Sequence, residues 1–167
     1  MLGHEQVLIC SGPPVAVPAS TLARENGRST MSLTTKLVLV VRDDLDPALA
    51  VNAAAVVGLS LGARLGHPLG DDGTDASGRS HAGLNPHPVP VLTASADALR
   101  DLHDRAQARQ DLITVGFNEV ARRARDYDDY LATLKSTSAA DVDFVAVAVF
   151  GPRNRVTALT KRFPLHA

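Results

Sequence analysis

Two runs of mostly aliphatic residues constrain the fold of this chain more than any other feature. They are Leu37–Val41 and Val142–Phe150, and both are rich in valine. Short runs of this kind are typical of β-strands that are covered on both faces, because an exposed face would carry polar residues at every second position. The sequence therefore predicts a sheet that is buried between two layers of helices.

Helix and strand signals alternate along the rest of the chain. Asp46 and Pro47 provide an N-cap and a first-turn proline for a helix that Gly66 ends. Pro90, within a strand predicted at 89–93, indicates an edge position, because proline cannot donate a ladder hydrogen bond. The other predicted elements are a helix from Ser95 to Arg109, a strand at 112–117, a helical stretch after Asn118 that Tyr127 and Tyr130 pack onto the sheet, and a short helix after Gly151 and Pro152. We therefore expect a three-layer α/β/α sandwich with a mixed, largely parallel four-stranded sheet.

The composition excludes several classes of protein. Lys and Arg number 17 against 18 Asp and Glu, so there is no surplus of positive charge of the kind that nucleic-acid binders use to neutralise phosphates. Cys10 is the only cysteine, which excludes a disulfide within the chain and a cysteine-based metal site. The longest apolar run, Ala53–Leu61, is short for a membrane span, and the N-terminus lacks the pattern of a signal peptide. We expect a cytoplasmic protein that binds no membrane, tRNA, metal or cofactor.

Residues 1–30 differ from the remainder of the chain. They contain the cysteine, several prolines and a polar stretch without periodicity, whereas Met31 leads directly into the first strand. Such a segment buries too little apolar surface to offset the entropy of ordering. We expect 1–30 to be a disordered N-terminal extension or the product of a start codon assigned too early, and 31–167 to form a single domain.

Four motifs occur in order over about 130 residues. They are Arg42-Asp43-Asp44 with its flanking Val and Leu, Asn52 with the three alanines that follow it, Asp75-x-x-Gly-x-x-His81-x-Gly, and Phe-Gly-Pro-Arg at 150–153. With these motifs, the chain from residue 36 to 167 resembles the bacterial family known as domain of unknown function 2000. That resemblance implies the fold of type II peptidyl-tRNA hydrolases.

The chain departs from the hydrolases at the residues that carry their activity. When it is laid without gaps on the enzymes, Leu49 and Val51 replace both lysines of their glycine-rich loop, and Ala55 and Gly58 replace their glutamine and histidine. Their Asp-Ala-Gly-x-Thr segment has no counterpart between residues 112 and 142. The resemblance therefore implies the fold but not the cleavage of peptidyl-tRNA, because chemistry depends on the site and not on the scaffold.

The candidate site starts at the carboxyl end of the first strand, where open α/β sheets collect ligands. Arg42 is a candidate anion clamp, and Asp43 and Asp44 are candidate acid–base groups or cation ligands. The alternative is a helix cap with a local Arg–Asp pair. Asn52, in the helix that follows, is a candidate ligand contact, or it hydrogen-bonds neighbouring backbone.

A polar loop at 66–86 is the second part of the candidate site. Loops of this length are more often functional than short ones, and Asp75 and His81 in it provide a carboxylate and an imidazole. If the loop folds over the strand end, His81 becomes a general base that works with Asp44. Asp, Gly and Ser are equally common in simple turns. His67 and His87, beside prolines, are interpreted as ordinary loop residues.

Arg122, Arg123 and Arg125 form a basic cluster next to Asp126, Asp128 and Asp129. The cluster could contact phosphates, but so many neighbouring carboxylates favour a solvated helix face whose charges are paired internally.

Three hypotheses about function remain open. The first is a protein that binds a small-molecule or nucleotide-related ligand at the carboxyl end of the first strand. The second is a divergent hydrolase of an ester or amide of an aminoacyl or peptidyl compound, with His81 and an Asp as its acid–base pair. The third is a homodimeric interaction module that pairs through an exposed sheet edge.

Overall fold

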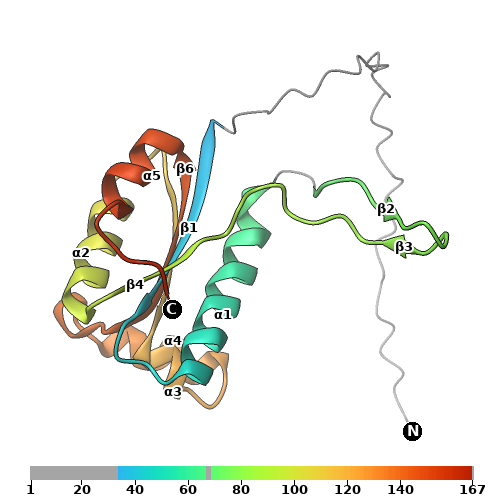
Figure 1. The fold of residues 1–167 in the computed structure, drawn as a ribbon. Helices are drawn as coiled ribbons and strands as arrows, with labels where there is room; N and C mark the ends of the chain where they lie inside the picture. The colour runs from blue at the N-terminus through green and yellow to red at the C-terminus, as the bar shows by residue number, and fades with distance from the viewer. Residues whose placement is uncertain (1–33, 67–68, 167) are drawn as a thin grey trace, which may run out of the picture. The chain divides into compact units, whose positions relative to one another are not determined.

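The computed structural model describes residues 34–66 and 69–166 (Figure 1). The expectation about residues 1–30 lies outside these residues.

The centre of the structure is a four-stranded sheet with the order β4-β1-β6-β5. The strands are β1 (Thr35–Arg42), β4 (Val91–Ala94), β5 (Ile113–Asn118) and β6 (Phe144–Pro152). The sheet is mixed, as predicted, but only the β1–β4 pairing is parallel, and β6 is antiparallel to both β1 and β5. The expectation of a largely parallel sheet was therefore too strong. Strand β6 is antiparallel because the chain reverses direction after β5 without crossing the sheet. Asn118, at the end of β5, pairs with Phe144, at the start of β6.

Helices cover both faces of this sheet (Figure 1). Helix α1 (Pro47–Leu65) packs on one face, while α2 (Ala96–Gln107) and α5 (Arg153–Thr160) pack on the other. Side chains of β1 alternate between the two cores, so that Val38 and Val40 contact the α2 side and Leu39 the α1 side. The predicted three-layer sandwich is confirmed.

The predicted helix boundaries are confirmed at three caps. The Asp46 side chain accepts a hydrogen bond from the Ala48 amide at 2.9 Å, and Pro47 is the first residue of α1. Gly66 ends α1 with a φ of 64°, a left-handed conformation that glycine adopts without a steric penalty. Ser95 caps α2. These local signals fix where α1 and α2 meet the sheet.

Helix α1 is apolar on its outer face as well as its inner one. Ala53, Val57 and Leu61 are buried against the sheet, whereas Val51 and Leu59 are 69% and 78% exposed. Among the residues described, α1 is the one helix that is long and apolar enough to cross a membrane by length and composition alone. The apolar run at 53–61 noted in the sequence was too short to indicate a helix of this length and hydropathy. Its inner face belongs to the core of the domain.

The sheet edge at β4 is covered by the C-terminal residues. The amide of Thr93 donates to the Pro164 carbonyl at 2.9 Å, and the amide of His166 donates to the Val91 carbonyl at 2.9 Å. The edge position predicted from Pro90 is confirmed, since β4 is the outermost strand on this side. Because these ladder groups are engaged, β4 is not an open edge at Val91–Thr93, and the other edge strand of the sheet is β5.

Two segments fold differently from the sequence prediction. The stretch after Asn118 contains two helices, α3 (Glu119–Arg123) and α4 (Tyr127–Ser136), capped by Asn118 and Asp126, and is followed by a short 3-10 helix, η1 (Ala139–Asp141). Tyr127 is 72% exposed, so the prediction that it packs this stretch onto the sheet is wrong. The loop after α1 contains a small hairpin of β2 (Gly73–Thr74) and β3 (Ser80–His81).

Gly116 offers a test of the packing between β5 and α2. A Cβ at this position would lie 2.5 Å from the Phe144 ring, which stacks on the His103 ring at 4.2 Å. We expect Gly116→Ala to lower the free energy of unfolding by about 1–3 kcal/mol, since the stacked rings must shift. Gly62→Ala is the control, because a Cβ there meets nothing within 4 Å and alanine favours the helix by about 0.5–1 kcal/mol. Urea denaturation measures both, and equal effects of the two substitutions would contradict the packing described.

Candidate functional site

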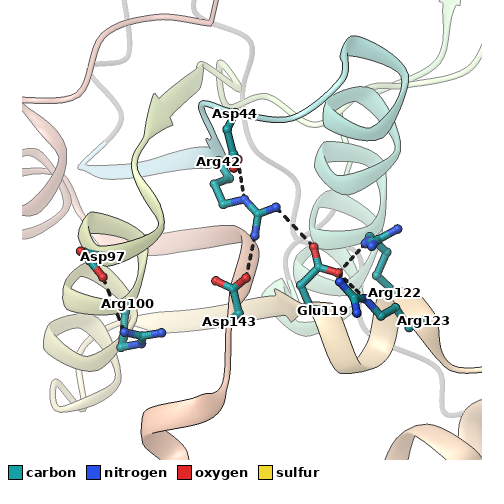
Figure 2. A network of polar contacts seen from close by, with 8 residues as sticks. All are labelled: Arg42, Asp44, Asp97, Arg100, Glu119, Arg122, Arg123 and Asp143. Atoms are coloured by element: carbon teal, nitrogen blue, oxygen red, sulfur yellow. Dashed lines mark hydrogen bonds and ion pairs between the residues drawn. The ribbon is translucent and has the colours of Figure 1, made fainter.

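Arg42 joins three segments of the chain at the carboxyl end of β1 (Figure 2). Its Nε donates to Asp44 Oδ1 at 2.6 Å, Nη1 to Asp143 Oδ2 at 2.8 Å, and Nη2 to Glu119 Oε1 at 3.4 Å. Asp143 directly precedes β6, and Glu119 is the first residue of α3. A single guanidinium therefore connects the end of β1 with the segments on both sides of the β5–β6 reversal.

Glu119 extends this network into α3. Its Oε2 accepts from Nε of Arg122 at 2.7 Å and from Nε of Arg123 at 3.1 Å (Figure 2). The Glu119 side chain is only 14% exposed, and so is that of Arg42. Opposite charges alternate through the network, so it is electrically balanced without a bound ion.

The surroundings shift the pKa of both central groups toward the charged form. Burial opposes ionisation of Glu119, but the hydrogen bonds and charges of Arg122 and Arg123 outweigh it, and the pKa of Glu119 lies below its ordinary value. Burial likewise opposes the charge on Arg42, but the hydrogen bond that Arg42 donates to Asp44, together with the charges of Asp44, Asp143 and Glu119, outweighs it, so the pKa of Arg42 is raised. Glu119 is therefore held charged by Arg122 and Arg123, and Arg42 chiefly by Asp44.

Of the residues predicted to form a site at the carboxyl end of β1, the structure brings only some together. The local Arg42–Asp44 pair is present, whereas Asp43 and Asn52 are exposed and make none of the Arg42 contacts described above. The three guanidinium nitrogens of Arg42 already contact carboxylates. An anionic ligand would have to displace one of them, which favours a positioning role for Arg42 over a clamp.

His81 and Asp75 lie together on the β2–β3 hairpin. His81 Nε2 lies 3.1 Å from Asp75 Oδ2, and the Asp75 carboxylate also accepts from the amides of Ser77 and Arg79. The amide of Arg79 is the largest cause of a lowered pKa at Asp75, followed by His81. The hairpin follows the carboxyl end of α1, about 28 Å along the helix from Asp46. The structure therefore pairs His81 with Asp75 and not with Asp44.

Cavities surround the segment 119–136, which we call the α3–α4 arm. No residue of α3 or α4 is buried, and three cavities of about 360, 390 and 300 Å³ are lined by residues of the arm or its caps. A segment that buries so little is held by few apolar contacts, and such segments open more readily than a core helix. The charge pairing predicted for this region is found in part: Arg125 pairs with Asp129, whereas Arg122 and Arg123 pair with Glu119.

The cavity of about 360 Å³ has the most ligand-like lining of the three. Its apolar walls come from α1 and β5 and include Val56, Val57 and Phe117. Polar residues also line it, among them Arg64, Asp126 and Tyr130. Apolar walls with a few polar groups are typical of small-molecule pockets, whose volumes run from about 300 to 1,000 Å³. The sequence does not reveal this cavity, because α1, β5 and the arm meet only in the fold.

A buried histidine that we had interpreted as an ordinary loop residue has polar partners from a distant strand. His87 is 8% exposed, its Nε2 lies 2.7 Å from Thr35 Oγ1, and its Nδ1 lies 3.1 Å from Asn85 Oδ1. Thr35 starts β1, 52 residues earlier in the chain. The only sign of this site in the sequence was the position of His87 between Pro86 and Pro88, two residues after Asn85.

No metal site is found among residues 34–66 and 69–166, where no group of three or more His, Cys, Asp or Glu side chains could hold an ion.

The comparisons with known proteins agree with the fold described above. The chain is a mixed α/β domain, and a family model described as protein of unknown function (DUF2000) matches residues 35–167. The chain therefore belongs to that family, as its motifs predicted. It is also similar to a solved protein of unknown function, Atu0240 from Agrobacterium tumefaciens strain C58, with 25% identity and a TM-score of 0.72 over 80% of this chain and 98% of that one. A search of curated proteins finds no match. The likeness to type II peptidyl-tRNA hydrolases stays a prediction.

Acid titration tests the Arg42 network. The unfolded chain protonates Glu119 near its ordinary pKa of 4.5, whereas the folded chain does so at lower pH. The network therefore stabilises the fold above pH 4.5, and this contribution is lost as the pH falls through the folded pKa. We expect the free energy of unfolding to fall less steeply below pH 4.5 in Glu119→Gln than in the wild type. Asp128→Asn, which removes an exposed carboxylate of the arm outside the network, should retain the wild-type slope; the same slope in all three proteins would contradict the assignment.

Proposed function

We propose that this protein binds a small molecule in the cavity between α1, β5 and the α3–α4 arm. The observation that supports this most is the combination of apolar walls with an arm that buries no residue. A ligand there would contact core side chains on one side and the arm on the other. Binding would supply the apolar contacts that the arm lacks in the free protein.

The lining indicates the chemistry of the ligand. Val56, Val57 and Phe117 favour an aliphatic or aromatic body. Arg64 at the rim favours an anionic group, and its Nη1 donates to the Ser60 carbonyl of its own helix at 2.5 Å, a bond that an anion could replace. We therefore propose an amphipathic small molecule with an acidic group, a class that includes nucleotide-related compounds.

This proposal changes the location expected from the sequence. Arg42, Asp44, Asn52 and His81 were expected to surround the ligand at the carboxyl end of β1. In the proposal, Arg42 instead fixes the start of the arm through Glu119, and the ligand lies beside β5.

Titration with the anionic dye anilinonaphthalene sulfonate tests the cavity. We expect saturable binding to the wild type, because the dye combines aromatic rings with a sulfonate. Val56→Trp should weaken binding by about tenfold or more by filling the cavity, and Arg64→Gln by a smaller factor through loss of one charge-assisted contact, worth about 1.5–3 kcal/mol at most.

Val51→Trp is the matched control, because Val51 lies on the same helix with its side chain in solvent. Retained affinity in Val51→Trp with loss in Val56→Trp supports the cavity. Equal affinity in all four proteins would refute it, and nucleotides or aromatic carboxylates that displace the dye would define the ligand class.

A second candidate function is self-association through the outer face of α1. Residues 47–63 carry no charged side chain, and the small exposed residues Ala48, Ala55 and Gly62 recur at intervals of seven beside Val51 and Leu59. An exposed, uncharged apolar face is complementary to itself, so a second copy related by a twofold axis can cover it. A charged partner would find no counter-charge there.

Sedimentation velocity tests this face over a range of concentrations. We expect the wild type to form dimers and Leu59→Glu to weaken the dimer by about tenfold or more, since it buries like charges near the axis. Leu84→Glu is the control, because Leu84 is as exposed as Leu59 but lies outside the helix. A wild type that stays monomeric, or equal effects of both substitutions, would contradict the proposal.

A further inference from the structure

We infer that Thr35, His87 and Asn85 form a nucleophile–base–positioning relay for the hydrolysis of small carboxylic esters. The relay lies at the start of β1, about 23 Å along the strand from Arg42, and is separate from the cavity proposed above. Its parts come from two segments that the fold brings together, the first residue of β1 and the end of the loop that leads to β4.

The contacts of Asn85 assign the donor role to Nδ1 of His87. Asn85 Oδ1 accepts from the backbone amide of His87 at 2.9 Å, which identifies this atom as the amide oxygen. The same oxygen lies 3.1 Å from His87 Nδ1, so Nδ1 carries the proton and donates it to this contact. The relay uses the neutral ring, in which Nε2 is the acceptor and lies 2.7 Å from Thr35 Oγ1.

The hydroxyl of Thr35 therefore donates to Nε2 of His87 at 2.7 Å. This is the geometry of an activated nucleophile, in which a base accepts the hydroxyl proton and a third group holds the base in one tautomer. The ring is further fixed by an edge-to-face contact with Phe150, with ring centroids 5.2 Å apart. Burial of His87 restricts the solvent that would compete for its lone pair.

A cavity of about 80 Å³ adjoins the hydroxyl and the imidazole. Thr35 and His87 line it together with Lys36 and Arg153. Its volume accommodates an acyl group of acetyl size and excludes a long chain. Lys36 and Arg153 bring two cationic residues into this lining, with Lys36 Nζ 3.4 Å from Thr157 Oγ1, and positive charge near the carbonyl favours the oxyanion of acyl transfer.

The proposed reaction needs only an ester and water. Thr35 Oγ attacks the carbonyl carbon and its proton passes to His87 Nε2, which gives a tetrahedral oxyanion. The oxyanion reforms the carbonyl, the C–O bond to the alcohol breaks, and the alcohol leaves with the proton from Nε2. Water then attacks the acyl-threonine ester and gives its proton to Nε2. Thr35 leaves the acyl group and takes that proton back, so that the products are a carboxylic acid and an alcohol.

The probe for this relay is p-nitrophenyl acetate, added to the full-length protein. We expect release of p-nitrophenolate and, after an acid quench, an acetyl group on Thr35 in the peptide mass spectrum. Thr35→Val and His87→Gln should each slow release by about a hundredfold, the factor that a general base typically contributes. Thr35→Ser should remain active, because it keeps the hydroxyl.

Asn85 is tested as a positioning residue by rescue. Asn85→Asp keeps an oxygen acceptor for Nδ1 and should retain acetylation of Thr35, whereas Asn85→Leu should lose it. His103→Gln is the matched control, since His103 is a partly buried histidine in a different part of the fold. Thermal unfolding of each variant separates loss of chemistry from loss of structure.

The outcomes decide the inference even if Thr35→Val does not fold. Acetyl on Thr35 in the wild type and in no residue of the His87→Gln protein supports the relay. Acetyl on Lys36 or on His87 alone, or release that is equal in the wild type and His87→Gln, overturns it and leaves the contacts as an anchor for the loop.

Discussion

The guanidinium of Arg42 joins the end of β1 to the residue before β6 and to the first residue of α3. Without it, the carboxylates of Asp143 and Glu119 would face a partly buried space with less positive charge between them. Its planar fork satisfies carboxylates in different directions at once, which the single ammonium of a lysine does not. Because Glu119 is the first residue of the α3–α4 arm, this interaction sets where the arm begins and therefore which cavities lie beneath it.

The mixed sheet changes where a ligand site is expected. In a parallel sheet all carboxyl ends lie at one edge, and ligands collect there because the loops and helix N-termini of successive units converge. Here β6 is antiparallel to β1 and β5, so the carboxyl ends of the strands do not all lie at one edge of the sheet. At one end the charged groups are paired with each other. The other end holds the contacts between Thr35 and His87, and the apolar cavity lies beside β5.

The sequence allowed correct predictions for features that depend on residues close together in the chain. The caps at Asp46 and Ser95, the buried strands and the Arg42–Asp44 pair all depend on residues close together in the chain, and each was found. The partners of Arg42 at Glu119 and Asp143 lie 77 and 101 residues away, and no local pattern reveals such contacts. The direction of β6 was missed for the same reason. His81 was preferred to His87 because its motif was recognisable, whereas the burial of His87 depends on β1.

The outer face of α1 explains why the resemblance to type II peptidyl-tRNA hydrolases should not be extended to their substrate. Leu49 and Val51 stand where gap-free comparison puts the lysines of those enzymes, and both side chains are exposed. A tRNA phosphate at this position would meet aliphatic carbon and would lose hydration without gaining a hydrogen bond or a counter-charge. Exposed apolar side chains are stabilised most when another apolar surface covers them. The same uncharged helix face is the surface on which the proposed association with a second copy of the chain rests.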